Sequence, residues 1–388
     1  MKRILIALCC LFVGCFSTES NKNFTDAEIA STKISDAIDN CVNSSEAITI
    51  DVDNVLGNDD HIFLDDMMDT ICFLPLETSE KSILGEIERL IVTDNRVFIW
   101  DYQGDILIFD INGKFVSKIM RGQGPGELIR VGDITFDDES GQLIVYDLPC
   151  YFKFFDINGR LISEKKIPLY CHEFCTCNDG YVLFQLFFTN KHLGVEARRA
   201  LMITNKDMEI KMKGVSLCES DLISTRPFIW KSGNKIMVSQ VANDTIFEVS
   251  YSSIIARYIL KYDTHRVDIS DIEIVENSDK YYRSGYSENS NTQIFTFTSF
   301  KQGQYYVIRD KRTGKSIGAK EVRSHANVVP LCFSAISVYN DYFVTDMQPR
   351  QGMHFTSNAI SEADNKKLEG LTEEDNPVLV FYKYKEIK

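Results

Sequence analysis

The chain lacks two features that would narrow its partners at once, a long apolar run and a surplus of basic residues. No stretch after Cys15 is long and apolar enough to span a bilayer, which takes about 20 residues. The 42 Lys and Arg residues are outnumbered by 56 Asp and Glu residues, the net charge is −14, and no Lys/Arg run stands out. Because an acidic domain repels a phosphate backbone, we expect no nucleic-acid partner.

The cysteines also lack the regular spacing of a disulfide framework. Besides Cys15 and the early pair Cys9 and Cys10, the cysteines are Cys41, Cys72, Cys150, Cys171, Cys175, Cys177, Cys218 and Cys332. An oxidising compartment would permit some bridges. Eight cysteines allow many pairings, so the sequence leaves their disulfide state open.

The N-terminus carries an export signal. Lys2 and Arg3 precede the apolar residues 4–13, a stretch that is too short to span a bilayer and is typical of a secretory signal. Gly14 then precedes Cys15 in a pattern that resembles a bacterial lipobox, whose cysteine carries the lipid. We therefore expect a signal peptide over residues 1–14 and a lipidated Cys15. A plain secretory signal with a chance cysteine is the alternative.

Residues 15–60 are rich in Ser, Asn, Asp and Thr and poor in aromatics. Such a composition buries little apolar surface, so we expect a lipidated cysteine followed by a flexible tether, and a folded domain over residues 61–388. The expected location is the cell envelope. The chain would be an outer-membrane lipoprotein held to the lipid bilayer through Cys15, on either the periplasmic or the surface face.

Two segments of the chain repeat each other without gaps. Asp101 matches Asp147 and Asp110 matches Asp156, both at an offset of 46 residues. The Asn-Gly pair at residues 112–113 likewise matches the pair at residues 158–159. A repeat of this length is typical of propellers and solenoids.

Each repeat reads as β structure. Short apolar runs at residues 106–109 and 151–155 lead into Asp-Ile-Asn-Gly, and another strand-like run follows. Asn-Gly can provide the two positive-φ positions of a tight two-residue hairpin. Four antiparallel strands in each repeat would make one propeller blade.

The number of blades follows from the remaining length. Residues 70–388 would give six blades of about 53 residues or seven of about 46. Polar insertions at residues 276–292 and 357–376, the second one helical near residues 363–369, favour six. The prediction is an all-β, six-bladed β-propeller of four-stranded antiparallel blades. We expect residues 71–74 and 378–384, near the two ends of the chain, to close the ring in one sheet, since an open ring would leave an exposed edge.

The chain resembles the six-bladed β-propeller lipoproteins of Bacteroidetes, whose blade pattern is similar to NHL repeats. The matching stretches are FLPLETS at residues 73–79, ILGEI at 83–87, GQGPGE at 122–127, NDTIFEV at 243–249 and NPVLVF at 376–381. The resemblance covers about residues 70–388 and implies the propeller fold. It implies little about activity.

A glycine-rich loop is the most unusual local feature and the candidate binding loop. Its residues are Arg121, Gly122, Gly124, Gly126, Glu127 and Arg130. Closely spaced glycines let a backbone turn sharply and expose its N–H groups, and the charged neighbours could line a polar site. The spacing fits neither a dinucleotide fingerprint nor a P-loop. A structural connection between blades is the preferred interpretation.

No metal site is identified, although a divalent ion, Ca or Zn, stays open as a cofactor. Residues 171–177 gather three thiols, an imidazole and a carboxylate, which zinc accepts. A strand would place Cys175 and Cys177 on one face, too far from Cys171 for a compact site. Asp101, Asp147 and Asp346 end strands and could face the central channel, but capping their own turns is the simpler role.

Two functions remain open. The first is an anchored binding or scaffold module, expected to be monomeric, whose propeller recognises a glycan, peptide or partner protein. The second is a lactonase-like hydrolase or lyase with a divalent metal in the central channel. Because fold alone does not decide function, and no catalytic residues are identified, binding is preferred.

The first prediction concerns the anchor. Cys15→Ser should abolish fatty-acid labelling and release soluble or unprocessed protein, because the sulfur that would carry the lipid is gone. Metabolic labelling with a radioactive fatty acid measures this. Labelling that survives the substitution would refute the assignment.

Overall fold

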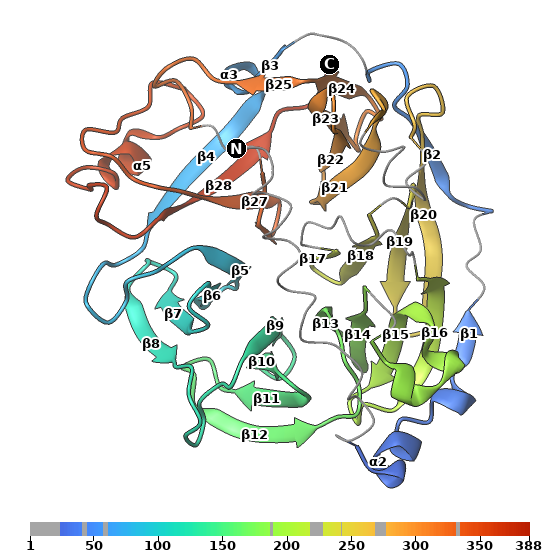
Figure 1. Ribbon diagram of the computed structural model, residues 1–388. Coiled ribbons are helices and arrows are strands. Elements are labelled where there is room, and N and C mark those ends of the chain that lie inside the picture. Colours follow the sequence, from blue (N-terminus) through green and yellow to red (C-terminus); the bar gives the residue numbers. More distant parts are fainter. Residues whose placement is uncertain are drawn as a thin grey trace.

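The computed structural model describes residues 24–40, 45–56, 61–186, 189–217, 228–241, 243–267, 277–330 and 334–388. The predicted signal peptide and Cys15 lie outside the described residues. The described chain forms a ring of six four-stranded antiparallel blades, as predicted (Figure 1).

The first three blades follow the chain in order, each from its innermost to its outermost strand. Blade 1 is β5 (Ile87–Val92), β6 (Arg96–Asp101), β7 (Ile106–Asp110) and β8 (Phe115–Ile119). Blade 2 is β9 (Val131–Asp137), β10 (Gln142–Asp147), β11 (Tyr151–Phe155) and β12 (Leu161–Lys166). Blade 3 is β13 (Glu173–Cys177), β14 (Gly180–Phe184), β15 (Arg199–Asn205) and β16 (Ile210–Ser216), with short 3-10 turns η4 (Lys191–Leu193) and η5 (Val195–Ala197) between β14 and β15.

The other three blades complete the ring. Blade 4 is β17 (Ile229–Ser232), β18 (Lys235–Ser239), β19 (Thr245–Ser250) and β20 (Ser253–Lys261). Blade 5 is β21 (Tyr282–Glu288), β22 (Thr292–Ser299), β23 (Gly303–Asp310) and β24 (Ser316–Ala319). Blade 6 is β26 (Ser337–Tyr339), β27 (Tyr342–Met347), β28 (Val378–Tyr384) and, from the start of the chain, β4 (Met68–Pro75).

This topology gives the ring two faces. Connections between the second and third strands of a blade, and the crossings from one blade to the next, lie on one side, which we call the crossing face. Hairpins between the first and second strands, and between the third and fourth, lie on the other side, which we call the hairpin face. The distinction follows from the antiparallel pairing within each blade.

The repeated Asp-Ile-Asn-Gly motif forms the hairpin between the third and fourth strands. Asp110 Oδ1 accepts hydrogen bonds from the amides of Asn112 (2.8 Å) and Lys114 (2.9 Å). Asp156 makes the same two bonds in blade 2. Only the glycine has a positive φ, +79° for Gly113. The predicted two-residue turn with two positive-φ residues is therefore wrong in detail, because the aspartate holds a longer turn that needs only one.

The core lies between neighbouring blades. Phe98 and Ile108 of blade 1, for example, share one buried cluster with Val145 and Phe155 of blade 2. In β6 and β10 five of six residues are buried, so both faces of these strands are covered by neighbouring blades.

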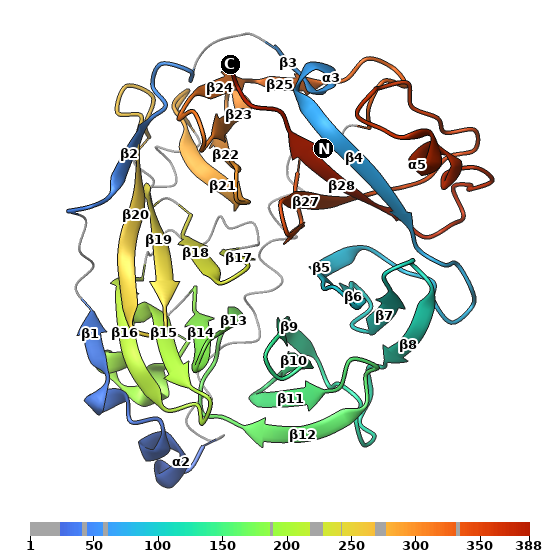
Figure 2. The same ribbon diagram turned by 180° about the vertical axis from the view of Figure 1, so that it is seen from behind.

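The N-terminal residues wrap the outside of the ring. After α2 (Asp26–Ser31) and the 3-10 turn η3 (Ile34–Asp36), β1 (Ile38–Asn40) adds to β16 and β2 (Ile48–Asp51) adds to β20, both in parallel. Next, β3 (His61–Phe63) pairs with β25 (Glu321–Arg323), and α3 (Leu64–Met67) leads into β4. We call the described part of residues 24–75 the N-terminal belt; Figure 2 shows β1 and β2 along the rim.

The flexible tether expected over residues 15–60 is therefore wrong for residues 24–40 and 45–56. Widely spaced apolar side chains of the belt enter clusters that the blades already form, which are Ile34 and Ala37 between blades 2 and 3, and Ile50, Val52 and Leu56 between blades 4 and 5. A segment too polar to build its own core can still fold when a neighbouring domain provides one.

Charged side chains join the belt to the blades as well. Four carboxylates of the belt each lie against a basic side chain of the ring: Glu28–Lys166 (2.9 Å), Asp39–Arg199 (2.6 Å), Asp53–His265 (3.0 Å) and Asp65–His325 (2.7 Å). These pairs add to the strand pairing and apolar burial that hold the belt on the ring.

The predicted ring closure is confirmed. β4 pairs antiparallel with β28, with Ile71 opposite Tyr382 and Leu74 opposite Leu379. A strand from the start of the chain thus completes the last blade. The predicted helix in the second insertion is present as α5 (Glu362–Lys366). The first insertion is wrong over its second half, because residues 282–288 form β21, the inner strand of blade 5.

The closure creates a tight contact that can be tested. A Cβ on Gly113 would overlap the carbonyl oxygen of Pro75, at the end of β4, whereas Gly141, also at positive φ, has open space around it. Gly141→Ala should cost about 1 kcal/mol through backbone strain alone, and Gly113→Ala at least twice as much. Urea unfolding of both variants measures the difference. Equal losses would mean that the contact with Pro75 is unimportant.

Candidate functional site

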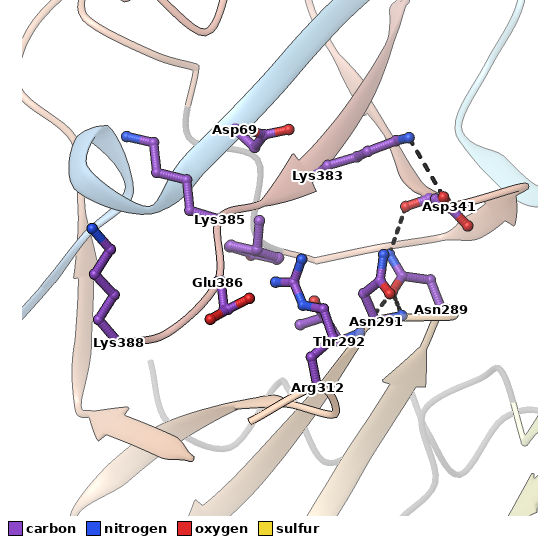
Figure 3. Close-up of a pocket in the computed structure, with 11 residues that line it drawn as sticks. Asp69, Asn289, Asn291, Thr292, Arg312, Asp341, Lys383, Lys385, Glu386 and Lys388 are labelled. Carbon is purple, nitrogen blue, oxygen red and sulfur yellow. Dashed lines mark hydrogen bonds and ion pairs between the residues drawn. The ribbon is translucent and has the colours of Figure 1, made fainter. Parts of the chain in front are cut away.

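A cavity of about 450 Å³ opens between blades 5 and 6. Its size lies in the range of small-molecule sites. The lining comes from hairpins of the hairpin face and from the C-terminal end of the chain (Figure 3). The lining residues are Asp69, Asn289, Asn291, Thr292, Arg312, Asp341, Lys383, Tyr384, Lys385, Glu386 and Lys388.

One wall of the cavity is organised by Asn289, in the turn between β21 and β22. Its side-chain oxygen accepts hydrogen bonds from the amides of Asn291 (2.9 Å) and Thr292 (2.8 Å). Its side-chain nitrogen donates to the carbonyl oxygen of Asp341 (2.8 Å), in blade 6. The side chain of Asn289 is thus used to hold the two blades together, and the side chain of Asn291 is left at the surface of the cavity.

Arg312 enters the cavity from the hairpin between β23 and β24. Asp310 holds it through two contacts, from Nε (3.0 Å) and Nη2 (2.8 Å). Burial would raise the pKa of Asp310, but the bonds from Arg312 and from the amide of Ile387 lower it to about 2. The guanidinium is therefore fixed in direction by a carboxylate that stays charged at neutral pH.

The opposite wall is the C-terminal end of the chain. Lys383 pairs with Asp341 (3.7 Å, dashed in Figure 3) and lies 4.0 Å from the ring centroid of Tyr342. Among the lining side chains, four are basic and three are acidic, in a chain whose net charge is −14. Mixed charges, two amides and two hydroxyls suit a ligand that both donates and accepts hydrogen bonds.

The sequence-predicted loop at residues 121–130 lies elsewhere, on the crossing face between blades 1 and 2. Glu127 turns back into the loop, where its carboxylate accepts a hydrogen bond from the amide of Gly124 (2.7 Å). A Cβ on Gly122 would overlap the same carboxylate. The glycines therefore make room for a side chain of the loop itself.

Both arginines of this loop are tied to neighbouring turns. The amide of Arg121 donates to Asp105 (2.8 Å), and the amide of Arg130 donates to Asp147 (2.8 Å). Lys153 Nζ reaches the carbonyl oxygen of Glu127 (2.6 Å) and pairs with Asp147 (2.8 Å). This geometry favours a structural connection, and a binding role for the loop remains a prediction.

The aspartates at strand ends differ from one another. Asp101 caps its own turn through the amide of Asp105 (3.0 Å), and burial raises its pKa. Asp147 instead caps Arg130 across the crossing and pairs with Lys153, as described above. Asp346, on β27, is exposed.

The thiols of residues 171–177 are split between two cores. Cys175 and Cys177 lie together in the cluster between blades 3 and 4, as their alternation predicts, and Cys171 packs against the cluster between blades 2 and 3. Burial raises the pKa of Cys175 to about 12 and that of Cys177 to about 11, so both are protonated thiols at neutral pH. No disulfide joins the cysteines within the described ranges, and His, Cys, Asp and Glu side chains there form no group able to hold a metal.

A buried charged cluster near the ring centre was missed by the sequence reasoning. Arg89, Asp133 and Glu173 lie on the inner strands of blades 1, 2 and 3, with Arg89 Nε 3.6 Å from Asp133 and Nη1 4.0 Å from Glu173. Burial would lower the pKa of Arg89, but attraction to the two carboxylates raises it. No motif marks these residues, because they meet only when three blades assemble.

The two carboxylates also join successive blades. Asp133 accepts a hydrogen bond from the amide of Phe174 (2.8 Å), and Glu173 accepts from the amides of Phe228 (2.9 Å) and Ile229 (3.0 Å). The inner strand of blade 2 therefore holds that of blade 3, which in turn holds that of blade 4. Asp133 and Glu173 are fully buried, and the cluster is structural.

The comparisons with known proteins agree with this fold. Residues 47–383 match the sequence profile of a family described as "Domain of unknown function (DUF4934)". A Bacteroides fragilis protein with the given name "Putative exported protein" has a similar structure, with a TM-score of 0.66 and 17% identity over 87% of this chain and 100% of that one. No curated protein matches the chain.

Two WD40 propellers are more distant. RRP9 gives a TM-score of 0.44 at 11% identity over 81% of this chain and 98% of that one. Doa1 gives 0.33 at 8% identity over 64% of this chain and 71% of that one. Neither similarity supports an argument about function. In the part of the chain that the structure describes, no helix is long and apolar enough to cross a membrane.

The buried cluster yields a prediction about stability. Arg89→Met should destabilise the domain by about 3–5 kcal/mol, because it leaves two buried carboxylates without their cation. The control is Arg266→Met, which removes an exposed partner of Asp244 (2.9 Å) and should cost less than about 1 kcal/mol. Chemical denaturation measures both. A loss for Arg89→Met no larger than the control would show that the cluster is not needed.

Proposed function

The chain belongs to the DUF4934 family, and we propose that it is an exported binding module, anchored through Cys15, that recognises a glycan in the cavity between blades 5 and 6. The observation that carries the proposal is the lining of this cavity. Nearly all of its side chains are charged, amide or hydroxyl groups, which match the hydroxyls of a sugar as donors and acceptors.

Export is supported by the basic and apolar residues at the start of the chain and by the similar fold of the Bacteroides fragilis protein named as exported. Lipidation of Cys15 rests on the lipobox-like sequence alone. The alternative is a lactonase-like hydrolase or lyase with a divalent metal in the central channel, which a bound metal found by elemental analysis of the purified protein would support.

Binding can be tested with an array of neutral and uronic-acid oligosaccharides of matched length, followed by calorimetry on those that bind. Arg312→Gln should weaken binding at least tenfold, since it removes the fixed charge while keeping a donor for Asp310. The matched control is Arg266→Gln, an ion-paired arginine outside the cavity, which should bind like the unmodified protein. No binding to any oligosaccharide, or equal binding by the two variants, would contradict a glycan site here.

A further inference from the structure

The chain enters the folded domain at a fixed point on the rim of the ring. Phe24 is buried and its ring stacks on His192 at 4.9 Å between centroids, with Tyr170 at 5.7 Å. Directly after it, Thr25 and Glu28 form a capping box, and Glu28 pairs with Lys166 of blade 2. These contacts place the start of the belt between blades 2 and 3.

The same contacts lie on the crossing face. Tyr170 belongs to the crossing from β12 to β13, and His192 belongs to the connection between β14 and β15. The cavity between blades 5 and 6 is lined from the hairpin face, by the turns that carry Asn289, Arg312 and Asp341. The entry point and the cavity are thus on opposite faces of the ring.

Few residues separate this entry point from the proposed anchor. Nine peptide units join Cys15 to Phe24 in the sequence, and such a length spans about 30 Å at full extension. A tether that reached residue 60 would have allowed the domain to move far from the membrane and to turn freely. The shorter link keeps the rim of blades 2 and 3 near the lipid surface.

The surface beside the entry point exposes large apolar side chains. Val195, on η5, is 79% exposed, and Ile38, at the start of β1, is 64% exposed; no large apolar side chain among the described residues is more exposed than Val195. Lys213 contacts both Glu196 of η5 and the carbonyl oxygen of Ile34 in η3, and so holds these two elements together. Lys33, Lys191 and Arg198 are exposed in the same segments, together with the acidic Asp36, Asp39 and Glu196, so the patch carries charges of both signs.

We propose that this part of the blade 3 rim, around Val195 and Ile38, rests against the lipid surface to which Cys15 is anchored, with the cavity directed away from the membrane. The proposal rests on the anchoring proposed above. Exposed aliphatic side chains are typical of surfaces that insert into the boundary between lipid head groups and acyl chains. A nearby covalent anchor raises their local concentration at the bilayer.

The test uses the full-length lipidated protein in vesicles of phosphatidylethanolamine and phosphatidylglycerol that contain a nitroxide-labelled lipid. The native Trp100 and Trp230 are both buried and give a background that can be subtracted. Val195→Trp should be quenched at least twofold more strongly than the control Ile111→Trp. Ile111 is 53% exposed in a turn of the hairpin face in blade 1.

The outcomes separate the two proposals. Unmodified protein that does not float with the vesicles would refute the anchor and the orientation together. Protein that floats but shows equal quenching at both positions would refute only the orientation. Protection of the Val195→Trp side chain without lipid quenching, together with a doubled mass in solution, would assign the surface to a second copy of the chain and would also overturn the proposal.

Discussion

Closing the ring is the constraint on which the rest of the structure depends. Each blade buries its side chains against the blade on either side. A last blade without its outermost strand would therefore have an unpaired strand edge and would open the cores on both of its sides to solvent. β4 removes that edge by pairing with β28, and its end at Pro75 then lies against the Gly113 turn of blade 1. Blades 6 and 1, which are farthest apart in the chain, become neighbours and share a buried core, in which Leu379 of blade 6 lies with Val97 of blade 1.

The inner side of the ring is held by a different kind of interaction. Asp133 and Glu173 each accept backbone amides from the next inner strand, and Arg283 of blade 5 donates to the carbonyl oxygen of Asn243 in blade 4 (2.8 Å). A buried polar group is stable only when it is bonded, so these side chains tolerate one arrangement of the blades and resist others. Apolar packing between blades is less directional. The polar contacts therefore set the angle at which the blades meet.

Function follows from where the ring leaves polar groups accessible. The sequence marks the glycine-rich loop as the candidate binding loop, yet the amide of Gly124 is hydrogen-bonded to Glu127 of the same loop. The cavity between blades 5 and 6 has the opposite character, because Asn289 and Asp310 hold other residues in place while Asn291, Arg312 and Lys388 line the open space. The belt enters the domain on the crossing face, so in the proposed orientation the cavity is directed away from the membrane.

The sequence by itself determined the elements whose information is local. Asp110, Asn112 and Gly113 specify a turn within five residues, and their repeat at Asp156 gave the blade and its length. The apolar ends near Ile71 and Val378 were enough to predict the closure, because two unpartnered strands and one open edge have a single compatible solution. The repeat does not predict the cavity, because the residues that line it are far apart in the sequence, as Asp69, Asn289 and Lys388 are.

Only the tertiary structure decided whether the polar N-terminal segment folds and which of the buried charged residues pair. Ile34 and Val52 are isolated apolar residues in a polar stretch. They become buried because they join clusters formed by neighbouring blades that are far from them in the sequence. Arg89, Asp133 and Glu173 have no mutual spacing that a sequence could reveal, since each lies on a different blade. Local backbone preferences and periodic apolar residues are encoded within a few positions, whereas the partners of buried charges depend on how the completed ring brings the blades together.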